Sequence, residues 1–192
     1  MDPVSGERRG APSAEAQLSF LAKIQRLFAE GDFTATYKFA LLVALSDLAV
    51  ELGADDGSEL VLSIRQIGHR FIELYWTHAS PYQVEVGEVQ AGVLSQNLGS
   101  QAVVVSALAA FRARSAANSP QAALTDPGYP GLLRLVSQAV SAQPINYLQN
   151  FGGATDEFLF ERAGAGKIRL KQGVAYCLRR FQPLVQQVAR SQ

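Results

Sequence analysis

The chain has 192 residues, of which 48% are apolar, and its 17 basic and 17 acidic side chains cancel to a formal charge of zero. This composition is typical of one globular domain or of two small ones. A single cysteine excludes a disulfide framework and a cysteine-rich zinc site, and two histidines are too few for most histidine-based metal centres, so we expect no cofactor. The longest apolar run, from Phe39 to Leu45, is far shorter than the roughly 20 residues of a membrane helix. Residues 1–12 lack the apolar segment of a secretion signal, and we expect a cytoplasmic protein with no membrane partner.

The zero net charge is the sum of two opposite halves. Residues 1–96 carry 13 acidic and 7 basic side chains, a balance of −6, and residues 97–192 carry 4 acidic and 10 basic side chains, a balance of +6. No acidic residue follows Glu161, whereas seven basic residues do. Such asymmetry indicates contact with nucleic acid or another anion. The alternative is that the two halves pack together and neutralise one another, and the charges alone leave both interpretations open.

The first part of the chain predicts helices after a loose tail. Residues 1–14 have almost no large apolar side chains and are expected to be disordered. Apolar residues at helical spacing predict a first helix over 15–30. A second helix, capped by Asp32 or Thr34 and ended by Gly53, is apolar on nearly all sides, which is typical of a central buried element.

The middle of the chain predicts further helices after an acidic linker, 54–59. A third helix is expected to start near Ser63, because Ser63 followed by Gln66 three residues later fits a capping box. The pattern then predicts a short helix over 84–98 and a longer one over 101–114, which is rich in alanine and valine.

The last third changes character. The stretch 116–131 contains three prolines and two glycines, which indicates a connector. A short amphipathic helix over 132–140 is expected to follow it. Two short alternating runs around a glycine-rich turn predict a β-hairpin over 157–171. A final helix begins at Gly173, and Pro183 is expected to kink or divide it.

These patterns predict a mainly α, multi-helix domain with one short β-hairpin near the C-terminus, of which a winged-helix-like arrangement is one form. The expected organisation is a disordered tail (1–14), a helical N-terminal domain (15–115), a connector (116–131) and a basic helix-hairpin-helix subdomain (132–192). The last subdomain either stands apart or packs with residues 15–115 as one domain.

The basic hairpin and the helix after it are the most informative features for function. Side chains alternate along a strand, so Lys167, Arg169 and Lys171 are expected to share one face of the hairpin. These three residues, with Arg179 and Arg180, are the predicted nucleic-acid contacts. In a winged-helix arrangement they would touch backbone phosphate while a helix enters the major groove. A solvated basic face, or a seam against the acidic N-terminal half, explains the same residues equally well.

Other candidate chemistry is weak, and we predict neither catalytic nor metal-ligating residues. The segment Gly164–Lys167 lacks the serine or threonine and the upstream glycine of a phosphate-binding loop, so a flexible hairpin turn is the better interpretation. Cys177 lies in an apolar helical context and is expected to be a buried, inert thiol. An enzymatic site built from His69, Glu73 and Tyr75 is a minor alternative, because nothing near them supplies an activated nucleophile or a metal.

The chain also resembles a known family over most of residues 18–190. The resemblance rests on Phe33–Glu51, on Phe71–Trp76 with the following Pro81–Tyr82, on Leu94–Leu98 and on Ile168–Phe181. Together these segments are similar to the N-terminal region of bacterial HNH endonuclease proteins of the restriction or phage-defence type.

The resemblance implies a role beside a nuclease, and not nuclease activity. In such proteins the following HNH module supplies a histidine base, metal-ligating residues and often zinc-binding cysteine pairs, and none of these can be placed after Phe181. We therefore expect a non-catalytic accessory module that positions an HNH-type endonuclease on nucleic acid through the basic C-terminal third. The expected nucleic acid is DNA. The expected partners of the module are nucleic acid and either a nuclease module or further copies of itself. The alternative is a helical protein-interaction or dimerisation module of a defence complex, with the second helix and the segment 102–110 as its packing surface.

Overall fold

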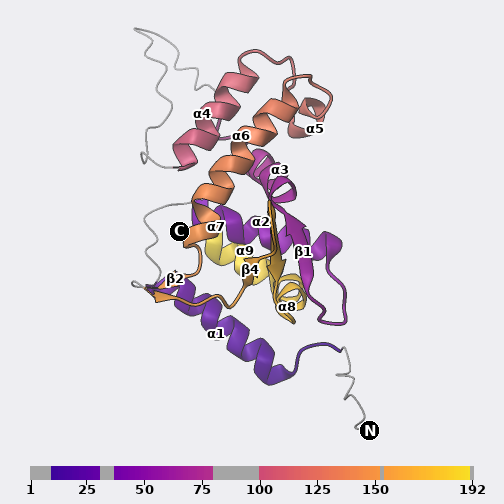
Figure 1. Cartoon of the computed structure of the whole chain (residues 1–192), viewed down its shortest axis with the longest axis vertical. Helices are drawn as coiled ribbons and strands as arrows, with labels where there is room; N and C mark the ends of the chain where they lie inside the picture. The colour runs from indigo at the N-terminus through magenta and orange to yellow at the C-terminus, as the bar shows by residue number, and fades with distance from the viewer. Residues whose placement is uncertain (1–9, 31–36, 80–99, 152–153, 191–192) are drawn as a thin grey trace.

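The computed structural model describes residues 10–30, 37–79, 100–151 and 154–190 (Figure 1). It is mainly helical with a small antiparallel sheet near the C-terminus, so the predicted fold class is confirmed. The predicted helix over 84–98 and most of the predicted N-terminal tail lie outside the described residues. Within the described residues, no helix is both long and apolar enough to cross a membrane. In chain order the elements are α1 (Ala14–Glu30), α2 (Tyr37–Leu52), β1 (Leu60–Ser63), α3 (Ile64–Tyr75), α4 (Ser100–Arg112), α5 (Pro120–Ala123), α6 (Tyr129–Ala142), α7 (Pro144–Tyr147), β2 (Asn150–Phe151), β3 (Ala154–Thr155), β4 (Phe160–Arg162), β5 (Lys167–Leu170), α8 (Val174–Arg180) and α9 (Gln182–Arg190).

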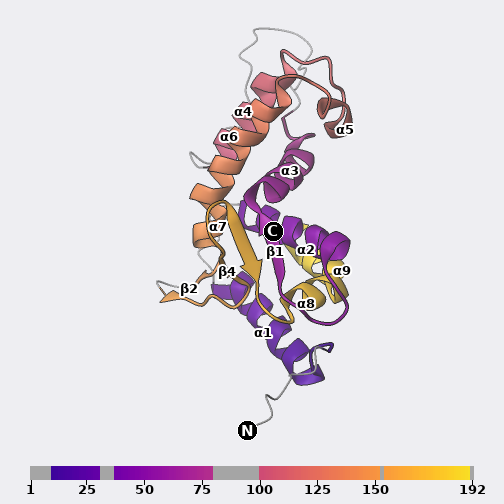
Figure 2. The same cartoon turned by 45° about the vertical axis from the view of Figure 1, so that its right-hand side comes forward.

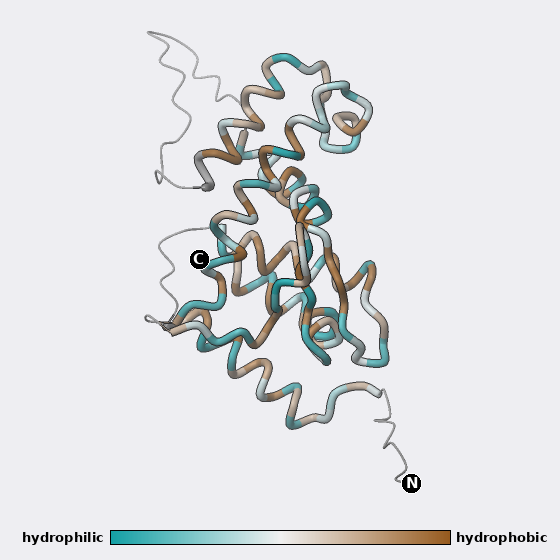
Figure 3. The backbone as a smooth tube through the Cα atoms, in the orientation of Figure 1, coloured by the Kyte–Doolittle hydropathy of each residue, from teal (hydrophilic) through white to brown (hydrophobic). Residues whose placement is uncertain are grey.

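Helix α2 is the centre of the fold, as its apolar sequence predicts. Ten of its 16 residues are buried, and it contacts α3, α7, α8 and α9. In Figure 3, apolar stretches run through these central elements. The buried hydroxyl of Ser46 donates to the carbonyl oxygen of Leu42 at 2.9 Å, so its polar group is satisfied within the helix.

A three-stranded antiparallel sheet, in the order β1-β5-β4, packs beside this centre. The predicted hairpin forms β4 and β5, and Glu161 lies opposite Arg169. Strand β1 adds to the other side of β5, with Val61 opposite Arg169 and Ser63 opposite Lys167. The sequence analysis did not predict β1, because four residues between an acidic linker and a helix cap are too few for a periodic pattern.

Helices α3, α4 and α6 form one end of an elongated molecule, and α1 and α8 lie towards the other (Figures 1 and 2). Helix α6 packs against both α3 and α4. A glycine allows α3 to approach α6 closely, because a Cβ atom on Gly68 would lie 2.6 Å from the Oγ of Ser137. The capping box at the start of α3 is present: the backbone N–H of Gln66 donates to the Oγ of Ser63 at 3.2 Å, and the backbone N–H of Ser63 donates to the Oε1 of Gln66 at 2.8 Å.

The C-terminal third is more helical than its turn residues suggest. The stretch 116–131, expected to be a connector, contains α5, which Ser119 caps by accepting from the N–H of Ala122 at 3.1 Å, and the first turn of α6. The final helix is divided, as predicted, into α8 and α9; the break is at Phe181, and Pro183 is the second residue of α9. One hydrophobic core includes buried residues from α1, α2 and α3 together with residues from α6, β5 and α8, so elements from 15–115 and from 132–192 share it.

Candidate nucleic-acid interface

Strand β5 separates a buried face from a charged one. Ile168 and Leu170 are fully buried, whereas Lys167 is exposed and Arg169 and Lys171 are partly exposed. The expected alternation is therefore present. The backbone N–H of Lys171 donates to the carbonyl oxygen of Leu159 at 3.0 Å, which fixes the chain just after the strand.

The aromatic residues around the hairpin belong to the core. Phe158 and Phe160 are buried, and Tyr176 and Phe181 are partly buried and pack against the same cluster. These aromatic residues therefore serve packing and not base stacking.

The middle of the charged face is neutralised by acids. The Nη1 of Arg169 donates to the Oε1 of Glu161 at 3.0 Å, and its Nε lies 3.7 Å from the Oε2 of Glu59. These two carboxylates come from the two strands, or their immediate flanks, on either side of β5. Arg169, predicted to contact phosphate, therefore has two anionic partners within its own chain.

Arg179 also has intramolecular partners. Its Nη1 donates to the carbonyl oxygen of Gly53 at 3.0 Å and to the Oδ1 of Asp55 at 2.7 Å. Gly53 directly follows α2, so Arg179 satisfies a carbonyl at the end of that helix and holds the loop that leads to β1. We assign Arg179 to this structural contact.

Lys167, Lys171 and Arg180 are the predicted site residues with no ion pair to any other described residue. Lys167 and Lys171 lie at opposite ends of β5, which places their Cα atoms about 13 Å apart. Arg180 is exposed at the last position of α8. The five predicted residues are thus not one continuous cluster.

The two oppositely charged halves meet in the fold. The contacts of Arg169 with Glu59 and of Arg179 with Asp55 each join a basic residue of the second half to an acidic residue of the first. The interpretation in which the halves partly neutralise one another is therefore correct for these pairs. It accounts for Arg169 and Arg179 but not for Lys167 or Lys171.

The hairpin tip lies beside the start of α3. Gly164 and Gly166 have φ angles of 84° and 69°, which suit glycine, and the carbonyl oxygen of Gly166 accepts from the N–H of Ile64 at 2.8 Å. The exposed Arg65 follows Ile64, so it lies near Lys167 at this end of the hairpin. No sequence pattern connects Arg65 with Lys167, because β1 is too short to be recognised. The pairing of Ser63 with Lys167 is what brings Arg65 to this end of the hairpin.

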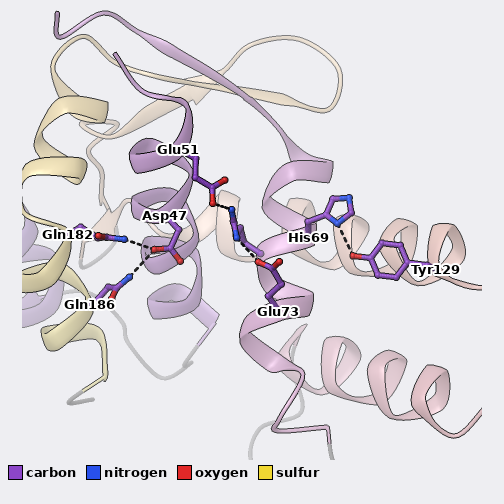
Figure 4. A network of polar contacts seen from close by, with 8 residues as sticks. Asp47, Glu51, His69, Glu73, Tyr129, Gln182 and Gln186 are labelled. Atoms are coloured by element: carbon purple, nitrogen blue, oxygen red, sulfur yellow. Dashed lines mark hydrogen bonds and ion pairs between the residues drawn. The ribbon is translucent and has the colours of Figure 1, made fainter. Parts of the chain in front are cut away.

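Polar contacts made by α3 include His69 and Glu73, two residues of the enzymatic alternative (Figure 4). The Nδ1 of His69 and the hydroxyl of Tyr129 are 2.7 Å apart, and Arg70 bridges Glu51 and Glu73. Burial lowers the pKa of His69 and raises the pKa of Tyr129 to about 12. A tyrosine with this pKa stays protonated and is a poor nucleophile.

Tyr75 and Cys177 complete the possible catalytic groups. Tyr75 is buried in the hydrophobic core, and burial raises the pKa of the Cys177 thiol to about 11, as expected of an inert cysteine. Within the part of the chain that the structure describes, no group of three or more histidine, cysteine, aspartate or glutamate residues is arranged to hold a metal ion.

The hairpin has a buried inner face and cationic ends. It is therefore a candidate anion-binding surface. No known protein family, no curated protein and no solved structure matches the chain.

Proposed function

We propose that this protein binds nucleic acid, most plainly duplex DNA, through the outer face of the β4–β5 hairpin, and that it positions an HNH-type endonuclease there. The observation that carries the proposal is the pair of lysines, Lys167 and Lys171, at the two ends of a strand whose opposite face is anchored in the core. A rigid strand holds both ammonium groups at the surface, where backbone phosphate can reach them. The nuclease partner rests on the resemblance alone.

The order of the elements supports this proposal. A helix, a strand and a helix (α2, β1 and α3) are followed by further helices and then by a hairpin that pairs with the first strand in the order β1-β5-β4. A winged-helix module is built in the same order, and its hairpin contacts the nucleic-acid backbone. The exposed tip around Gly164 and Gly166, where an added Cβ atom would meet nothing within 4 Å, leaves room for such an approach.

A duplex fits this surface better than a single strand. Proteins that bind single strands without sequence preference stack bases on exposed aromatic side chains. Phe158 and Phe160 of the hairpin are only 9% and 2% exposed, so they present no stacking surface. Phosphate contact by flexible lysines is the interaction that remains, and it carries little sequence information.

The fold covers much of the surface of the protein-interaction alternative. Helix α2 is mostly covered by α3, α7, α8 and α9 of the same chain, and Val104 and Leu108 of α4 are buried in the core. Val103 of α4 is 52% exposed, so a smaller apolar surface remains for this alternative.

The test is a fluorescence-anisotropy titration of the full chain with a short duplex DNA and with a single strand of the same sequence. We expect tighter binding to the duplex, and affinity that falls steeply between about 50 and 200 mM salt because bound phosphates release counterions. Replacing Lys167 or Lys171 by alanine should weaken binding about tenfold each, since a hydrogen bond to a charged group contributes about 1.5 kcal/mol or more.

The matched control is Arg114→Ala, which removes one exposed positive charge just beyond α4, whereas the hairpin lies nearer the middle of the molecule (Figure 1). It should leave affinity nearly unchanged. Absence of binding at low salt would overturn the proposal, and so would an equal loss in the Arg114 and lysine variants, because binding would then depend on overall charge and not on the hairpin.

A further inference from the structure

Arg169 occupies the centre of the proposed binding face, yet two carboxylates flank it. The side chains of Arg169, Glu59 and Glu161 are 40%, 53% and 43% exposed, so solvent and a phosphate group can reach all three. The group carries two negative charges for one positive charge. Between the lysines at its ends, the face therefore has a local excess of negative charge.

The backbone fixes this arrangement. Glu161 lies directly opposite Arg169 in the β4–β5 register, and Glu59 immediately precedes β1, whose Val61 lies opposite Arg169 on the other side. A phosphate that approaches Arg169 must displace a carboxylate or lie beside both of them. The pairing of the strands fixes the backbone of both acids beside Arg169, so both carboxylates stay within reach of the arginine.

Stability gives little reason for two acids at this position. Exposed ion pairs contribute little to folding, and the strands are already held by their backbone hydrogen bonds and buried face. An arginine between two lysines would form a stronger phosphate-binding strip without the acids. The second carboxylate is thus unfavourable for anion binding and nearly neutral for the fold.

We propose that Glu59 and Glu161 limit the affinity of this face for nucleic acid by holding Arg169 away from phosphate, so that the backbone is contacted at the two ends of β5 and not at its centre. This inference rests on the proposed function and adds the residues that regulate it. A module that positions a nuclease benefits from such a limit, because a weaker phosphate contact allows release and movement along a duplex.

The test compares Glu59→Gln, Glu161→Gln and the double variant with the unmodified chain in the same duplex titration. Glutamine keeps the size of the side chain and removes its charge. We expect each single change to raise affinity about threefold and the double change to raise it about tenfold, with a salt dependence steeper by about one released counterion as Arg169 gains a phosphate. Glu157→Gln is the matched control, because it changes the net charge by the same amount as each single variant. Glu157 is exposed and forms no ion pair with the described residues.

The role of Arg169 is tested by adding Arg169→Ala to each background. The alanine should change affinity little in the unmodified chain and should abolish the gain in the double glutamine variant. Equal gains in the Glu157 control and the double variant would overturn the inference, as would a gain that persists without Arg169. If the unmodified chain binds and Lys167→Ala weakens binding, but the glutamine variants show no gain, the inference fails while the proposed function stands; if no variant binds, both fail. Thermal unfolding of every variant separates these outcomes from loss of fold.

Discussion

The two faces of the β1-β5-β4 sheet come from the same short strands, but the inner face is apolar and buried and the outer face is exposed and carries charged residues. On the inner face, Leu62, Ile168 and Leu170 are completely buried against the helices. On the outer face, Val61 is 48% exposed and its neighbours across the strands are charged. Because side chains alternate along a strand, one set of residues stabilises the fold while the other lies at the surface, where we propose that nucleic acid binds. Substitutions at inward-facing positions should therefore lower the free energy of unfolding, and those at outward-facing positions should change binding.

The outer face also shows how lysine and arginine differ. Two of the three arginines predicted to contact nucleic acid, Arg169 and Arg179, donate to carboxylate oxygens of the same chain. Lys167 and Lys171 have no such partner among the described residues. A planar guanidinium with several fixed donors suits a bridging contact, whereas a lysine is a mobile point charge. Arg169 and Arg179 thus connect segments of this chain, whereas Lys167, Lys171 and Arg180 have no ion pair with the described residues.

The largest expected effect compares the two faces directly. Leu170→Ala removes a fully buried side chain and should lower the free energy of unfolding by about 2–5 kcal/mol, because it leaves a cavity in a packed core. Val61→Ala on the outer face should change it by no more than about 0.5 kcal/mol. Urea unfolding followed by circular dichroism measures both values. Similar losses in the two variants would show that the outer face is covered in solution and would contradict the comparison.

A smaller loss of unfolding free energy is expected from a substitution at the contact between α3 and α6. Gly68→Ala would place a methyl group 2.6 Å from the Oγ of Ser137 and 3.2 Å from the Cδ1 of Leu133. Overpacking of this kind costs about 1–3 kcal/mol, which exceeds the roughly 1 kcal/mol that alanine gains over glycine in a helix.

Ser137→Ala provides the control for that contact. The buried Oγ of Ser137 has no hydrogen-bond partner among the described residues, so its removal alone should be neutral or stabilising. In the Ser137→Ala background, Gly68→Ala should cost less than in the unmodified chain, and unfolding of the four proteins gives the coupling free energy. A coupling free energy of zero would mean that the helices separate to accept the methyl group.

Local patterns predicted most of the helices and the hairpin. Apolar spacing identified α1 and α2, the Ser63–Gln66 pair identified the start of α3, and Pro183 indicated the division of the final helix to within two residues. Each of these signals acts within a few residues of where it appears, so it is visible in the sequence without knowledge of the fold. The alternation along β5 likewise separated its core residues from its surface residues correctly.

The rest depends on contacts between distant parts of the chain. Strand β1 is four residues long and is stabilised by pairing with β5, more than 100 residues later. The partners of Arg179 are similarly remote, since 124 residues separate it from Asp55. Composition predicted a basic surface, but only this long-range pairing distinguishes the cations that hold the fold from those that remain exposed.

The smallest expected effect concerns His69, which lies between the buried layer and the surface. Burial is the main cause that lowers its pKa, so the folded state favours the neutral ring more than the unfolded state does. Its contribution to stability is therefore fully present above the ordinary histidine pKa of about 6.5 and is lost as the pH falls from there through the folded-state pKa. The unmodified chain should thus lose unfolding free energy between about pH 7.5 and pH 5.5, and His69→Gln should lose less. His78→Gln, which removes an exposed histidine, is the control and should behave like the unmodified chain. An identical pH dependence in the His69 and His78 variants would contradict this prediction. It would show that the His69 ring accepts a proton as readily in the folded state as in the unfolded state.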